Sequence, residues 1–166
     1  QAGATYFGEI RLPTKPLTDF VTIRSSAADK FPEEERVGPA AAVLMPKILA
    51  RGAGRSAITA ENGAHHYRFV GIEFTATGDD YVYNLILFGN GEAGDKVPHD
   101  IEIDRCYLHP GKTGVVRRGI ALNSAITTIK NSYLEGFGFP GEETQGICGW
   151  TGTRNVRIIN NYIEGG

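Results

Sequence analysis

Basic side chains gather in one short stretch of this chain, where His109, Lys112, Arg117 and Arg118 lie close together in sequence. Arginine and lysine bind carboxylate groups, and such side chains are also candidates for the general base that takes a proton from a substrate. The stretch is therefore a candidate site for holding an anionic ligand or for taking a proton. The alternative interpretation is a solvated loop in which one arginine pairs with a nearby acid.

Two pairs of adjacent acids offer a different chemistry. Asp79 with Asp80, and Glu142 with Glu143, could supply the two carboxyl groups that hydrolyse a glycosidic bond. One carboxyl group would donate a proton, and the other would activate water or attack directly. Adjacent acids on a turn are commonly just solvated, so hydrolysis ranks below proton abstraction.

Four more residues are predicted to bind a ligand with sugar rings and hydroxyl groups. Trp150, the only tryptophan, can stack on a sugar ring. Asn84, Asn123 and Gln145 can form hydrogen bonds to hydroxyl groups. The structural alternatives are a tryptophan that fills a corner or the core, and an asparagine ladder that points inward.

His65 and His66 are adjacent in the sequence. Neighbouring side chains on a strand point to opposite faces, so we expect the two rings to point apart. A metal site needs ligands that converge. We therefore predict no metal site in this chain.

The elements that must position these residues repeat at intervals of roughly 30 residues, which is typical of a solenoid. Each copy has a branched apolar residue followed four positions later by an aromatic residue. The equivalent residues are Val70, Ile103, Ile129 and Ile158, and then Phe74, Tyr107, Tyr133 and Tyr162. A second phrase keeps step with the first and places Ile86, Ile120 and Ile147 in equivalent positions.

Period-two alternation and β-branched residues run through each copy, which favours strands over helices. The alternation breaks at Asn131 and Asn160, where asparagine can turn a sharp corner. The pattern predicts an all-β fold, in which three short strands per coil wind into a parallel β-helix. We expect the registered tyrosines to stack and to fill its interior.

The phrases HHYRFVGIEF, HDIEIDRCYLH, RGIALNS, QGICGW and NNYIEGG resemble the right-handed parallel β-helix repeat proteins of the pectate-lyase-like superfamily. More narrowly, they are similar to a group of secreted bacterial proteins that are described only by this repeat. The resemblance covers residues 18–166. The catalytic motifs of pectate lyases and galacturonases are absent, except for the Asp79–Asp80 pair.

The resemblance implies a secreted, periplasmic or cell-surface protein that binds an acidic polysaccharide. It also implies cleavage by β-elimination if the chain is an enzyme. Arg118 or Lys112 would then be the base, with Arg117 and His109 nearby, and Ca²⁺ could neutralise the substrate carboxylate. The alternative is a non-catalytic scaffold that binds a glycan or a protein, including a tailspike-like structural protein.

Composition agrees with one β-helix domain over residues 1–166, with a loop excursion at about residues 27–47. The net charge of −2 and the lack of a basic stripe predict no nucleic-acid partner. The chain contains no apolar run long enough to predict a membrane span.

Cys106 and Cys148 fall at different repeat positions, so we expect no disulfide between them. The sequence begins and stops close to repeat phrases, so we expect further coils or end-to-end stacking.

Overall fold

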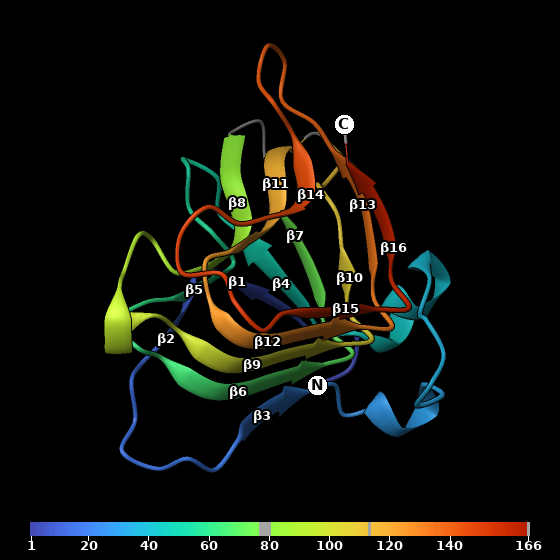
Figure 1. Cartoon of the computed structure of the whole chain (residues 1–166). Helices are drawn as coiled ribbons and strands as arrows, with labels where there is room; N and C mark the ends of the chain where they lie inside the picture. The colour runs from blue at the N-terminus through green and yellow to red at the C-terminus, as the bar shows by residue number, and fades with distance from the viewer. Residues whose placement is uncertain (77–80, 113, 166) are drawn as a thin grey trace.

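The structure is a computed structural model that describes residues 1–76, 81–112 and 114–165. The chain winds around an axis and passes through three sheets on each coil (Figure 1). Each strand pairs in parallel with its equivalents on neighbouring coils. The predicted parallel β-helix with three strands per coil is therefore confirmed.

The described strands fall into three sheets. Sheet A contains β1 (Thr5–Phe7), β4 (Lys47–Ala50), β7 (Glu73–Ala76), β10 (Tyr107–Leu108), β13 (Tyr133–Phe137) and β16 (Tyr162–Gly165). Sheet B contains β2 (Ile10–Leu12), β5 (Ile58–Ala60), β8 (Tyr81–Phe88), β11 (Val115–Leu122) and β14 (Gln145–Cys148). Sheet C contains β3 (Val21–Arg24), β6 (His65–Val70), β9 (His99–Asp104), β12 (Ala125–Lys130) and β15 (Arg157–Ile159). Short 3₁₀ helices are η1 (Ala28–Lys30), η2 (Pro39–Leu44) and η3 (Gly94–Lys96).

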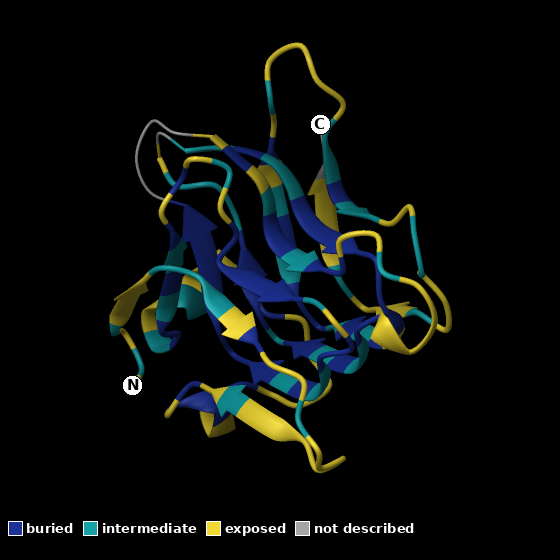
Figure 2. Cartoon of the chain, turned by 90° about the vertical axis from the view of Figure 1, so that its left-hand side faces the viewer, coloured by how far each residue is buried: buried dark blue, intermediate teal, exposed yellow. Residues whose placement is uncertain are grey.

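Two isoleucine columns predicted from the sequence form part of the interior. Ile129 pairs with Ile103 on one side and with Ile158 on the other. In sheet B, Ile120 pairs with Ile86 on one side and with Ile147 on the other. Buried residues run along the strands of the three sheets (Figure 2), and their apolar side chains form one core cluster. Each fully buried isoleucine contributes about 1.5–3 kcal/mol to folding, so these columns are a main source of stability.

The alignment of Phe74 with Tyr107 is wrong by one residue. Phe74 pairs with Leu108, and Glu73 pairs with Tyr107. Phe74 and Leu108 are both fully buried, so the structure matches interior residues to each other rather than aromatic residues to each other. The same shift occurs one strand earlier, where the pairs are Phe69–Ile103 and Val70–Asp104.

The prediction that the tyrosine series fills the interior is also wrong, although the rings do stack. Tyr107, Tyr133 and Tyr162 lie on the outer face of sheet A, and the rings of the last two are 4.3 Å apart between centroids. The next residue along each strand fills the interior instead, as with the fully buried Leu108 and Leu134. Because successive side chains of a strand point to opposite faces, the tyrosine column and the leucine column lie on opposite faces of sheet A.

The excursion between β3 and β4 covers part of this outer face. It lies beside the corner where sheet C passes into sheet A (Figure 1). Phe31, Val37 and Met45 from the excursion form a second apolar cluster with Val70 and Tyr107. The excursion therefore buries a tyrosine ring that the coil alone would leave exposed.

Left-handed backbone marks the same corner on successive coils. The residues with positive φ there are Gly71, Arg105, Asn131 and Asn160. The predicted corners at Asn131 and Asn160 are confirmed, because asparagine tolerates this conformation. Three corner side chains also donate hydrogen bonds to excursion carbonyls, from Arg105 to Phe31 at 3.1 Å, Asn131 to Glu33 at 3.1 Å and Asn160 to Glu34 at 3.3 Å.

The last described coil exposes apolar side chains to solvent. Ile158 is 48% exposed and Ile163 is 43% exposed, whereas their partners Ile129 and Leu134 are fully buried. Stacking of a further coil or a second chain on this surface stays a prediction. Among the described residues, no helix has the length and apolar character needed to cross a membrane.

The two cysteines are both free thiols, as predicted. Cys106 lies at the corner between sheets C and A, where burial raises the pKa of its thiol to about 12. Cys148 ends β14 in sheet B. The two residues therefore belong to different sides of the coil.

Replacing Tyr107 by alanine tests the role of the excursion. The Tyr107 ring is only 8% exposed, so we expect Tyr107→Ala to lower the free energy of unfolding by about 3–5 kcal/mol. Tyr162→Ala, at the exposed end of the same column, should have a much smaller effect. Urea denaturation measures both variants. A Tyr107→Ala protein as stable as the wild type would contradict the placement of this ring.

Candidate functional site

Loops of unequal length border sheet B. The segments 109–114 and 138–144 both connect a strand of sheet A to a strand of sheet B. Residues 77–80, between β7 and β8, lie outside the described part of the chain. The segment 89–98 instead precedes β9, at the corner between sheets B and C. The loops therefore gather mostly at one edge of sheet B (Figure 1).

Arg118, in β11 of sheet B, contacts the ring of Trp150, which follows β14. Trp150 is 53% exposed, so it does not fill the core or a corner. The guanidinium carbon of Arg118 lies 5.3 Å from the centroid of the Trp150 ring, a cation–π contact. Its Nε donates a hydrogen bond to Oε1 of Gln145 at 3.0 Å. Among the described residues, no carboxylate forms an ion pair with Arg118.

Three further aromatic side chains lie at the loop edge of the same sheet. Tyr81 and Tyr83 are 40% and 43% exposed, and their ring centroids are 4.8 Å apart. Phe139, from the loop before β14, stacks on Tyr83 with an angle of 12° between the ring planes. Sequence reasoning missed this cluster. The signal was the alternating Tyr81 and Tyr83, which places both rings on one face of β8.

Arg117 follows the alternative interpretation of the basic stretch. Its guanidinium forms an ion pair with Glu142 at 2.9 Å. Its Nε also donates a hydrogen bond to the backbone carbonyl of Glu143 at 3.0 Å. Glu142 is thus engaged with an arginine. The other predicted acid pair, Asp79 and Asp80, lies outside the described residues.

The predicted hydroxyl-binding residues have different surroundings. Asn84, Arg118 and Gln145 occupy one register position on three neighbouring strands, so they form a row across sheet B. Asn84 has a buried Oδ1 without a hydrogen-bond partner among the described residues. Asn123 is buried, and its Oδ1 accepts hydrogen bonds from the backbone N–H groups of Trp150 and Thr151. Asn123 therefore holds the backbone at Trp150 in place, a structural role that differs from the asparagine ladder considered as its alternative.

The basic stretch does not form one site. Lys112 is exposed in the loop between sheets A and B. His109 lies on the side of sheet A, where its Nε2 is 3.0 Å from Oε1 of Glu73. Its Nδ1 faces the backbone carbonyl of Pro110 at 2.7 Å. Both ring nitrogens of His109 therefore face acceptors that belong to its own side of the coil, away from Arg118.

Glu73 is the centre of a buried ionic network on this outer face. Its side chain is 2% exposed, and both carboxylate oxygens lie 2.5 Å from Nζ of Lys47. Burial alone would raise the pKa of Glu73, but hydrogen bonds from His109 and Lys47, together with their charges, lower it overall. The neighbouring Tyr107 stacks on His109 with 4.2 Å between ring centroids. The network is closed and stabilises sheet A.

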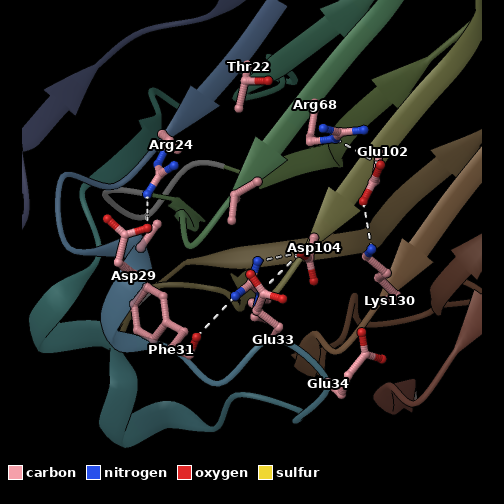
Figure 3. Close-up of a pocket in the computed structure, with 13 residues that line it drawn as sticks. Thr22, Arg24, Asp29, Phe31, Glu33, Glu34, Arg68, Glu102, Asp104 and Lys130 are labelled. Carbon is pink, nitrogen blue, oxygen red and sulfur yellow. Dashed lines mark hydrogen bonds and ion pairs between the residues drawn. The ribbon is translucent and has the colours of Figure 1, made fainter. Parts of the chain in front are cut away.

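A groove of about 660 Å³ lies between the outer face of sheet C and the excursion (Figure 3). Its basic side chains are already paired with acids. Arg68 and Lys130 both bind Glu102 at 2.9 Å, while Arg105 binds Asp104 at 2.7 Å. The remaining lining charges are Arg24, paired with Asp29, and the acids Glu33 and Glu34. An anionic ligand would have to break ion pairs in order to bind here.

His65 and His66 do not point apart, contrary to the prediction. Their Nδ1 atoms are 2.8 Å from each other, because His66 has a left-handed φ of 58°. This conformation interrupts the strand alternation on which the prediction relied. Burial lowers the pKa of His65, and the charges of His99, His66 and Lys15 lower it further.

Comparison with known proteins gives no relative. No protein-family model, no curated protein and no solved structure matches this chain. The resemblance to pectate-lyase-like proteins thus depends on the repeat phrases, and the structure supports its architecture.

Replacing Glu73 by glutamine tests the buried network on sheet A. Because the pKa of Glu73 is lowered on folding, its carboxylate stabilises the fold fully above the ordinary value of 4.5. This stabilisation is lost as the pH falls through the lowered pKa. At neutral pH we expect Glu73→Gln to lower the free energy of unfolding by about 2–3 kcal/mol, and the difference from the wild type should shrink in acid.

Urea denaturation at a series of pH values checks this expectation. Glu164→Gln, which removes an exposed carboxylate from the same sheet, is the matched control. A loss of stability for Glu73→Gln that stays constant from neutral pH to strong acid would show that the carboxylate charge is not the cause.

Proposed function

We propose that this chain is an extracytoplasmic carbohydrate-binding β-helix module that holds an acidic polysaccharide on the outer face of sheet B. The observation that supports the proposal best is the contact between Arg118 and Trp150. An exposed aromatic ring lies there beside a guanidinium that has no carboxylate partner among the described residues. Uronic acids combine a sugar ring with a carboxylate, and this pair of side chains complements both.

The rest of the face suits a chain of sugars. Tyr81 and Tyr83 lie several residues before the level of Trp150 along the strand direction, at about 3.3 Å per residue. Exposed rings therefore lie on either side of the row that contains Arg118, one group before it and one ring after it along the strand direction. A polysaccharide lying along the strands could stack on an aromatic ring at each end and bind the guanidinium between them.

The other two outer faces suit this ligand less well. On sheet A, the charges around Glu73 satisfy one another and are largely covered. On sheet C, the groove contains more acids than bases, and its bases are already in ion pairs. An anionic ligand gains little from a cation that already has a partner.

Cleavage by β-elimination would add a base to this binding step. Sheet B and its loops offer Arg118 and Lys112 for that role, whereas His109 lies on the side of sheet A and contacts Glu73 and the backbone of Pro110. Ca²⁺ could assist by neutralising the uronate carboxylate. We propose binding as the primary activity and treat cleavage as the finer question, with a non-catalytic scaffold as the alternative.

Binding and cleavage can be measured in one set of incubations. The protein is mixed with pectate, alginate or a glycosaminoglycan, with Ca²⁺ or with EDTA. Calorimetry reports binding, and ultraviolet absorbance reports the unsaturated product of a lyase. Binding without product would establish a non-catalytic module, and release of reducing ends without absorbance would indicate hydrolysis. An absence of binding to all three polymers would refute the proposal.

Two substitutions on sheet B test the residues directly. We expect Trp150→Ala and Arg118→Gln each to weaken binding of the acidic polymer about tenfold or more, because each removes a contact of roughly 1.5 kcal/mol or more. Arg118→Gln should have little effect on a methyl-esterified, neutral polymer. Arg157→Gln is the control, since it removes the same charge from an exposed position on sheet C. Equal losses for Arg118→Gln and Arg157→Gln would indicate a general charge effect and would contradict a site at sheet B.

A further inference from the structure

Three of the four histidines converge at the corner where sheet B passes into sheet C. His65 and His66 begin β6, while His99 and Asp100 begin β9 on the next coil. His65 pairs in register with His99, and their rings are parallel with centroids 5.0 Å apart. One potential ligand atom from each of His66, His99 and Asp100 lies within 4.8 Å of the other two.

The bend of the backbone does not require these residue types. His66 and Asp100 have φ values of 58° and 51°. On the next two coils, Ile126 and Asn155 have φ values of 50° and 53° near the start of their strands. Isoleucine is strongly disfavoured in this region, so the coil geometry imposes the bend on whatever residue is present. Histidine and aspartate tolerate this conformation, so the bend accounts for His66 and Asp100 but not for the histidines that precede them, His65 and His99.

We propose that His66, His99 and Asp100 bind a divalent transition-metal ion of the zinc class, with His65 as the fourth ligand. Imidazole nitrogen and carboxylate oxygen are preferred ligands of Zn²⁺, whereas Ca²⁺ needs several oxygen ligands. The cluster offers three nitrogens and one carboxylate, which matches a tetrahedral zinc site.

An ion fits after two movements: each pair opens slightly, and the two pairs approach each other, because the ligand atoms of His66, His99 and Asp100 lie within 4.8 Å rather than about 3.3 Å and His65 is outside this group of three. The Nδ1 atoms of His65 and His66 are 2.8 Å apart, and Nδ1 of His99 is 2.6 Å from Oδ2 of Asp100. In a tetrahedral zinc site, neighbouring ligand atoms are about 3.3 Å apart, so each pair opens by roughly half an ångström. The ion replaces the hydrogen-bonding proton within each pair, and neutral imidazoles keep their remaining proton on the other nitrogen.

The surroundings hold the rings and leave a path for the ion. Phe20 packs against His66 with 5.1 Å between ring centroids. The side chains of His99 and Asp100 are 33% and 25% exposed, so an ion can reach them from solvent. Because the ligands belong to β6 and β9, the ion joins two successive coils and stabilises the folded chain by binding to it.

Titration of the untagged protein with Zn²⁺, followed by calorimetry, tests the proposal. We expect one equivalent to bind with micromolar or better affinity and to raise the melting temperature. Co²⁺ should give the intense visible absorption of a tetrahedral ion, and Ca²⁺ should have no effect. A wild-type protein that shows no saturable binding of Zn²⁺ would refute the site.

Two variants copy residues that the fold already accepts at this corner. His99→Ala copies Ala125, its register partner on the next coil, and His66→Asn copies the left-handed Asn155. Each should fold normally in EDTA and bind Zn²⁺ at least tenfold more weakly. Asp100→Asn, in which asparagine also tolerates the bend, provides a third test if either variant fails to fold.

His109→Asn is the matched control, because it removes the one histidine outside the cluster. Its affinity for Zn²⁺ should equal that of the wild type. Unchanged affinity in the corner variants, or an equal loss in His109→Asn, would place the bound ion elsewhere and overturn the proposal.

Discussion

Register between parallel strands on successive coils is the constraint on which this structure depends. Each interior side chain contacts its equivalents on the coils before and after it, as Ile129 contacts Ile103 and Ile158. A slip by one residue would turn every inward side chain of a strand outward, so the buried columns fix the register strongly. The same constraint arranges outward side chains in columns. Residues distant in sequence thus become neighbours on one face, and the chemistry of the molecule belongs to faces rather than to segments.

The corners of the coil also decide which side chains become neighbours. A left-handed residue redirects its side chain and those of its neighbours, and register repeats the effect from coil to coil. At the corner between sheets C and A, Asn131 and Asn160 use this geometry to hold the excursion against the coil. At the corner between sheets B and C, the same geometry brings His66 beside His65. One backbone device therefore supports both the covering segment and the histidine cluster.

The sequence predicts the repeating strands of this fold, but it does not show on which face of the coil an aromatic or basic side chain lies. Ile86 and Ile120 were matched correctly because complete burial limits both positions to similar side chains. Tyr107 was placed inside because a ring covered by a remote excursion has the same sequence signature as a ring in the core. The basic stretch shows the same limit. It turns from sheet A to sheet B, so His109 and Arg118, close in sequence, lie on different sides of the coil.

The contrast between the three outer faces follows from how each charge is already satisfied. Glu73 on sheet A and Glu102 on sheet C are both held by two basic side chains, and in each case those partners lower the pKa that burial alone would raise. Breaking such an ion pair costs more free energy than binding of a new ligand supplies. Arg118 on sheet B binds only neutral groups among the described residues, namely Gln145 and the ring of Trp150. A carboxylate that approaches Arg118 breaks no ion pair among the described residues, and this difference in cost, more than the count of basic residues, is why we propose sheet B as the face for an anionic ligand.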